Sequence, residues 1–271
     1  PSAQAFAQDF LNLFRVKRFQ PVTVDPARMQ QLQASNFDIQ SLLSSSTEIT
    51  KHPGDARVVP SVQAASQAVG FSVKSPSALP PGVSLNEIRV QGEGTVRFTA
   101  DTERLKALLD AAGVTDVKLP TALNGKTVTV NKPALVIMSY GNSRDNIMFL
   151  QSHNPQVQLP DGVDMAQLGE IALRFAGMKA DEARNFARTI DWTSTLLVPV
   201  PATATSFSKV MVGNSEGLLI TTGGAMAAAF DTKGTRVPSQ GSTLVWVDGD
   251  MVYAITGAGS TSLIDIATSL R

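Results

Sequence analysis

The chain of 271 residues is long enough for one large domain or two ordinary ones, each with a substantial buried core. Its 43% hydrophobic and 17% charged content is typical of a globular protein and excludes an intrinsically disordered one. Lys plus Arg equals Asp plus Glu at 23 each, so no overall field attracts nucleic acid or an anionic bilayer.

The first eighteen residues combine spaced aromatic side chains with a basic cluster. The aromatic spacing predicts an amphipathic helix over residues 3–14. Small-x-small triplets within residues 3–7 resemble the end of an export signal, so residues 1–18 are interpreted as a membrane-proximal or post-signal helix, with a membrane or signal segment upstream of Pro1. The alternative is an ordinary alanine-rich helix start. The candidate partner-binding residues here are Phe6, Phe10, Phe14, Arg15, Lys17 and Arg18.

Residues 19–160 alternate between strand and helix patterns. Helices are expected after Ser61, where Gly70 ends the pattern, and after Asp101, a typical N-cap residue. Gly92-Glu93-Gly94 separates two strand patterns, which predicts a hairpin. The expected strands of this part are 19–24, 85–90, 95–99, 126–130, 134–140 and 146–151.

Two amphipathic helices are expected between residues 164 and 190. Asp164 and Gln167 form a capping-box pattern at the start of the first helix. We expect the two helices to form a helical hairpin, inserted between strand-rich regions. Further strands are expected at 206–212 and 217–221.

The last thirty residues, Ser242 to Arg271, have the clearest local pattern. An Asp248-Gly249 pair between two apolar runs predicts a tight hairpin, because the turn requires positive φ. Trp246 and Tyr253 are the expected aromatic anchors of its strands. The apolar positions of the closing helix fall on one face and predict that it packs on the sheet: Leu263, Ile266, Ala267 and Leu270.

These patterns predict an α+β fold, with a largely antiparallel sheet, helices packed on one face and an inserted helical hairpin. We interpret residues 19–271 as one domain. The alternative is two strand-rich halves, about 19–160 and 195–271, joined by the helices of 164–190.

The sequence contains few residues in patterns typical of a catalytic or metal site. Without Cys and with only two His, disulfides and thiolate sites are excluded and a multi-histidine metal site is not expected. His52 and His153 are the only histidines that could act as catalytic bases, and no serine lies in a G-x-S-x-G nucleophile-elbow motif. Gly-rich phosphate-binding patterns are also absent from the sequence. We therefore expect no enzymatic activity, no cofactor and no nucleic-acid partner.

Two stretches carry a family resemblance. Residues 64–83, AASQAVGFSVKSPSALPPGV, and residues 243–270, with an L-W-DG-Y-I…L-IA-SL pattern, resemble the opening and closing signatures of bacterial DUF4367-type extracytoplasmic domains. The N-terminal LFRVKRFQPVTV resembles the segment that follows the membrane helix in related membrane-anchored, anti-sigma-factor-like proteins. The resemblance carries no catalytic residues.

The resemblance implies a non-enzymatic extracytoplasmic sensor or interaction domain of a membrane-anchored envelope protein, with protein partners in the cell envelope. One alternative is a periplasmic carrier that binds a lipid or another small apolar ligand within its sheet. Another is a hydrolase, which requires Ser, Asp or Glu beside His52 or His153 in a cleft.

Overall fold

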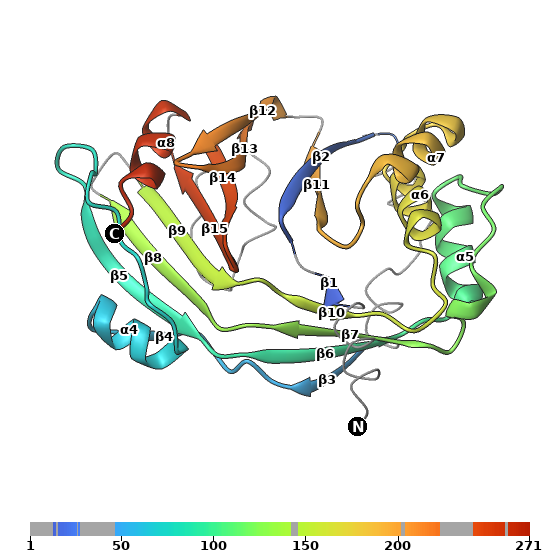
Figure 1. Ribbon diagram of the computed structural model, residues 1–271, viewed down its shortest axis with the longest axis horizontal. Helices are drawn as coiled ribbons and strands as arrows, with labels where there is room; N and C mark the ends of the chain where they lie inside the picture. Colours follow the sequence, from blue (N-terminus) through green and yellow to red (C-terminus); the bar gives the residue numbers. More distant parts are fainter. Residues whose placement is uncertain are drawn as a thin grey trace.

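Strands dominate the part of the chain that the structure describes (Figure 1). The computed structural model describes residues 13–14, 16–25, 27, 47–141, 146–201, 204–222, 241–257 and 260–271. These residues form an eight-stranded sheet, a five-stranded sheet and a two-stranded sheet. No described helix is long and apolar enough to cross a membrane.

The eight-stranded sheet is antiparallel throughout. Its strands are, in spatial order, β12 (Ala204–Val212), β13 (Ser215–Thr222), β14 (Gly241–Asp248), β15 (Met251–Gly257), β9 (Asn146–His153), β8 (Leu135–Gly141), β5 (Ser84–Gln91) and β4 (Arg57–Val59).

The five-stranded sheet is also antiparallel, whereas the two-stranded sheet is parallel. The first contains β1 (Leu13–Phe14), β10 (Gln156–Gln158), β7 (Thr127–Lys132), β6 (Gly94–Thr99) and β3 (Thr47–Lys51). The second pairs β11 (Thr195–Pro201) with β2 (Arg18–Val24). The helices are α4 (Val62–Val69), α5 (Thr102–Ala111), α6 (Met165–Phe175), α7 (Ala180–Thr189) and α8 (Ser260–Thr268), with a 3₁₀ turn at Thr121–Leu123.

The two larger sheets are joined by strands that pass from one into the other (Figure 1). β5 pairs with β8 up to Gln91↔Leu135, and β6 pairs with β7 from Gly94↔Lys132 onward, in the same register. β9 and β10 continue each other in the same way beside β8 and β7. The predicted hairpin at residues 92–94 is therefore wrong, because this segment interrupts one long strand without reversing it.

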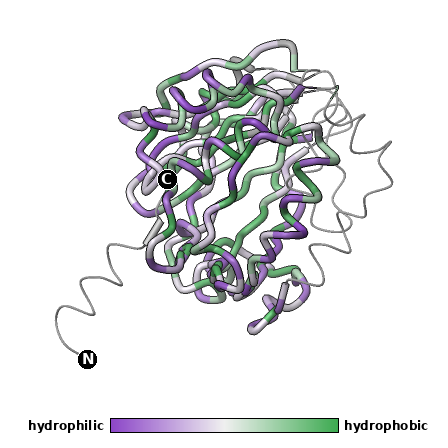
Figure 2. The backbone as a smooth tube through the Cα atoms, turned by 90° about the vertical axis from the view of Figure 1, so that its right-hand side faces the viewer, coloured by the Kyte–Doolittle hydropathy of each residue, from purple (hydrophilic) through white to green (hydrophobic). Residues whose placement is uncertain are grey.

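The central strands of the eight-stranded sheet, β14, β15, β9 and β8, are buried on both faces. One face, with Phe149, Trp246 and Ile255, packs against α4 and α8. The opposite face, with Ile220 and Val245, packs against β2 and β11. In Figure 2, hydrophobic stretches run along the central strands, and hydrophilic stretches gather toward the outer helices and turns.

Smaller apolar clusters involve the other helices. Leu109 of α5 packs with Ile171 of α6. Val22 of β2 packs with Leu173 of α6 and Ala183 of α7. α6 and α7 thus contact the parallel strand pair, and they lie at the end of the molecule opposite α8 (Figure 1).

The chain end is tied to the segment between α4 and β5. Ser75 and Arg271 exchange two backbone hydrogen bonds, with N···O distances of 3.0 and 3.2 Å. The side chain of the fully buried Gln151 donates to the backbone oxygen of Lys74 at 2.8 Å and accepts from its nitrogen at 2.9 Å. The two stretches that carry the family resemblance therefore lie against each other.

The expected fold class is wrong. Strands make up 44% of the described residues, so this part of the chain is mostly β and does not have the expected helix-packed α+β layout. Helices cover one face of the large sheet, and a parallel strand pair covers the other. The apolar periodicity of a strand shows which face is buried but does not show what covers that face.

Several local predictions are confirmed. Ser61, Asp101 and Asp164 each accept backbone N–H bonds at the start of a helix. Asp248-Gly249 lies in the turn between β14 and β15, and Gly249 has a φ of 63°. Within α8, the expected face is buried at Leu263, Ile266 and Ala267.

We predict that Trp246→Ala lowers the free energy of unfolding by about 3–5 kcal/mol, as is typical of a buried aromatic side chain lost from a core. Trp246 is 3% exposed and its ring stacks on Tyr253 at 5.1 Å between centroids. Urea unfolding measures the change. Phe207→Ala is the matched control, because Phe207 is 46% exposed on β12. Equal losses in the two variants would contradict this packing.

Candidate functional site

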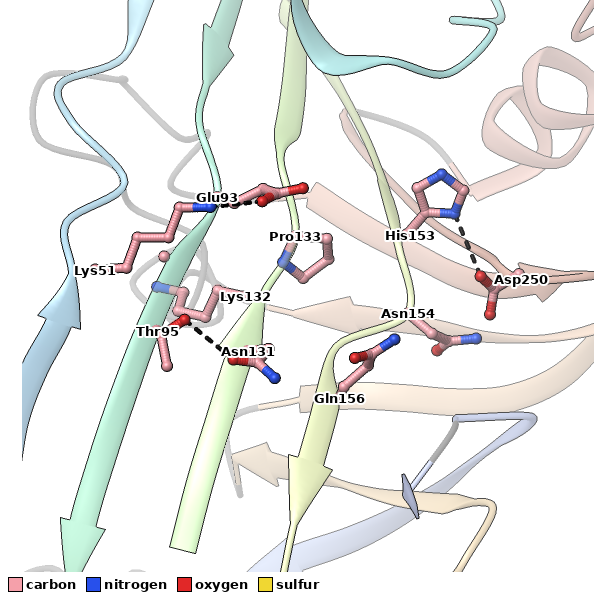
Figure 3. Close-up of a pocket in the computed structure, with 11 residues that line it drawn as sticks. Lys51, Glu93, Thr95, Asn131, Lys132, Pro133, His153, Asn154, Gln156 and Asp250 are labelled. Carbon is pink, nitrogen blue, oxygen red and sulfur yellow. Dashed lines mark hydrogen bonds and ion pairs between the residues drawn. The ribbon is translucent and has the colours of Figure 1, made fainter. Parts of the chain in front are cut away.

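The main candidate site is a cavity of about 490 Å³ where the two larger sheets join (Figure 3). We call it the bend pocket. Its lining comes from β3, β6, β7, β9, β10 and the turn between β14 and β15, so it forms only in the folded chain. The lining residues are Lys51, Glu93, Gly94, Thr95, Asn131, Lys132, Pro133, His153, Asn154, Gln156 and Asp250.

The strand interruptions place these residues together. Pro133 and Pro155 cannot donate a backbone N–H to a ladder, so each favours a break in its strand. Gly92 donates its N–H to the oxygen of Pro53 at 3.1 Å, and a Cβ at Gly92 would lie only 2.9 Å from that oxygen. Glycine is therefore required where the segment after β3 crosses the bend.

One cross-strand row supplies polar groups. Thr95 of β6 pairs with Asn131 of β7, which pairs with Gln156 of β10. Directly opposed residues of an antiparallel sheet share a face, so all three side chains project on the same side. The Thr95 hydroxyl bonds to Asn131 Oδ1 at 3.0 Å, which fixes the orientation of the amide.

Two lysines lie on one side of the bend pocket (Figure 3). Lys51 Nζ donates to Glu93 Oε2 at 2.7 Å, and this hydrogen bond, helped by the lysine charge, lowers the pKa of the Glu93 carboxyl. Lys132 is exposed and has no ion-pair partner among the described residues. This side therefore carries one positive charge that the described chain does not neutralise.

His153 and Asp250 lie on the other side (Figure 3). His153 Nδ1 is 3.4 Å from Asp250 Oδ2, without a well-formed hydrogen bond. The Phe71 ring meets the imidazole edge-on at 5.0 Å between centroids. Asp250 follows the turn glycine, so the hairpin of β14 and β15 brings its carboxylate to the bend.

Asn154 holds three segments together beneath the pocket. Its backbone N–H donates to the oxygen of Asp250 at 2.8 Å, and its Nδ2 donates to the oxygen of Val16 at 3.0 Å. Asn154 is 5% exposed, and its Oδ1 is buried without a hydrogen-bond partner. The side chain of Asn154 therefore acts mainly as a structural link under the pocket.

The pocket places Asp250 beside His153, as the hydrolase alternative requires, but no hydroxyl of the described lining residues lies beside this pair. Among the described lining residues only Thr95 carries a hydroxyl, which bonds to Asn131 and lies across the pocket from His153 (Figure 3). The Ser152 hydroxyl donates to the oxygen of Ala134 at 2.9 Å. The described residues contain no cluster of three or more side chains able to hold a metal ion.

A second cavity, of about 230 Å³, lies at the same hairpin near α8. Lys74 lines it, with Nζ 3.4 Å from Asp248 Oδ2 and 5.6 Å from the centroid of the Tyr253 ring. The chain therefore supplies its own cation there, and the bend pocket is the stronger candidate.

The structure describes only some of the candidate partner-binding residues near the N-terminus. Phe6, Phe10 and Arg15 lie outside the described residues, and Phe14 belongs to β1. Lys17 and Arg18 are exposed, and their backbone N–H groups both donate to the oxygen of Ser194, at 2.7 and 3.1 Å. The segment before β2 contacts Asn154 through the backbone oxygen of Val16, not through these basic side chains.

Sequence reasoning missed the bend pocket. The available signals were Gly92, Pro133 and Pro155, which interrupt apolar strand patterns at separate places in the chain. Only the pairing of the strands shows that these interruptions lie side by side. Comparison of the chain with protein-family models, with curated proteins and with solved structures gives no match.

We predict that Asn154→Ala lowers the free energy of unfolding by about 1–3 kcal/mol, because the buried oxygen of Val16 loses its donor. Guanidinium unfolding measures the change. Gln156→Ala is the control, since Gln156 also lines the pocket but is exposed. An unfolding midpoint for Asn154→Ala equal to that of Gln156→Ala would show that Asn154 does not hold the segments together.

Proposed function

We propose that this protein is a non-enzymatic sensor or interaction domain of the bacterial cell envelope, and that its ligand is polar and binds in the bend pocket. The observation that carries the proposal is a cavity of about 490 Å³ whose polar groups are held in place by strand register and hydrogen bonds. Pockets with a few well-placed polar groups are the usual sites of small-molecule binding.

The lining favours a polar ligand over a lipid. Lys132, Asp250 and the amides of Asn131 and Gln156 would each lose hydration beside an alkyl chain without gaining a partner. An apolar carrier also needs an enclosed apolar cavity, whereas both faces of the eight-stranded sheet are filled by packed clusters. The export-like N-terminal pattern and the family resemblance support the extracytoplasmic part of the proposal.

The test uses thermal unfolding in the presence of amino acids and short peptides, mono- and disaccharides, and di- and tricarboxylates. A ligand that binds only the folded state raises the melting temperature. Gln156→Trp should block the pocket with a large side chain. Gln158→Trp is the matched control, because Gln158 is also exposed on β10 but does not line the pocket.

We predict that at least one class of compound stabilises the wild type and Gln158→Trp but leaves Gln156→Trp unchanged. The proposal is wrong if no class shifts the melting temperature, or if the shift persists in Gln156→Trp.

A further inference from the structure

We infer that the bend pocket binds a short zwitterionic peptide, with the peptide carboxylate at Lys132 and the peptide ammonium group at Asp250. The inference rests on the proposed function, because it names the class of ligand that the same pocket takes. It follows from the placement of charge and of hydrogen-bonding groups across the pocket.

The lysine side attracts a carboxylate. Glu93 neutralises Lys51 at 2.7 Å, so it is Lys132 that offers an ammonium group without an ion-pair partner in the described chain. A carboxylate that reaches Lys132 forms a charge-assisted hydrogen bond, which is stronger than a bond between neutral groups.

The aspartate side attracts a cation. The contact between Asp250 and His153 is 3.4 Å long and lacks good hydrogen-bond geometry, and it is an ion pair only when His153 is protonated. The Asp250 carboxylate therefore has free acceptor capacity for an ammonium group. Figure 3 shows Lys132 and Asp250 on opposite sides of the pocket, which suits a ligand whose two charges are separated.

The groups between the two charges match peptide units. Each peptide unit carries one N–H donor and one carbonyl acceptor. The exposed Gln156 amide offers both a donor and an acceptor. Asn131 Oδ1 already accepts from Thr95, so the Asn131 amide is left with its NH₂ as a donor toward a carbonyl.

Other polar ligands fit the charges less well. A dicarboxylate brings a second negative charge toward Asp250, and a diamine brings a second positive charge toward Lys132. A neutral sugar leaves both groups without a counter-charge. Discrimination against these ligands follows from repulsion and lost hydration as much as from attraction.

The experiment is isothermal titration of the full chain with trialanine at neutral pH, compared with N-acetyl-trialanine and trialanine amide. The first blocked peptide lacks the ammonium group, and the second lacks the carboxylate. We expect saturable binding of trialanine, weakened about tenfold or more by either block, as is typical of a lost hydrogen bond to a charged group.

The variants Asp250→Asn and Lys132→Met test which residue binds each end of the peptide. Asp250→Asn should weaken the binding of trialanine about tenfold but leave the binding of N-acetyl-trialanine unchanged. Lys132→Met should also weaken the binding of trialanine about tenfold but leave the binding of trialanine amide unchanged. Asp248→Asn, in the same hairpin, and Lys126→Met, at an exposed position just before β7, are the matched controls and should bind like the wild type.

Equal affinity for free and blocked peptides would overturn the inference. The inference is also overturned if trialanine does not bind. The proposed function still holds in that case if another class of compound stabilises the wild type but not Gln156→Trp. A protein that responds to no class of compound would overturn both.

Discussion

The fold depends on a strand register that stays unbroken where the sheet bends. Gln91↔Leu135 on one side of the bend and Gly94↔Lys132 on the other belong to the same antiparallel pairing. A slip of one residue would turn every following side chain to the opposite face. Because the register is kept, Ile88 and Val136 point into the helix-covered core, while the row of Thr95, Asn131 and Gln156 points into the bend pocket.

The same constraint explains why polar groups gather at this place. The ladder is interrupted at residues 92–93, 133–134 and 154–155, so the bend combines side chains from strand ends with the turn between β14 and β15. A regular, fully paired sheet would bury or space out these groups. Asn154 secures the arrangement because it bonds to both Asp250 and Val16. Asn154 thus links the bend to the turn between β14 and β15 and to the segment before β2.

The sequence predicts the local elements well. Helix caps at Ser61, Asp101 and Asp164 and the Asp248-Gly249 turn depend on interactions between near neighbours, which residue type and spacing reveal. It does not predict the long-range arrangement. A glycine such as Gly92 is equally favourable in a hairpin turn and in a strand break. The close approach of its backbone to Pro53, which the local sequence does not reveal, distinguishes the two. The parallel pairing of β2 with β11 joins segments that are distant in the chain, and the pocket lining is likewise assembled from separate segments.

Cross-strand contacts between Hα protons, observed by NMR, test the unbroken register most directly. An unbroken register gives contacts that link β5 with β8 and β6 with β7, on both sides of the bend. Contacts between β5 and β6 would instead show a hairpin turning at residues 92–94. That result would contradict the bend and, with it, the pocket that the bend creates.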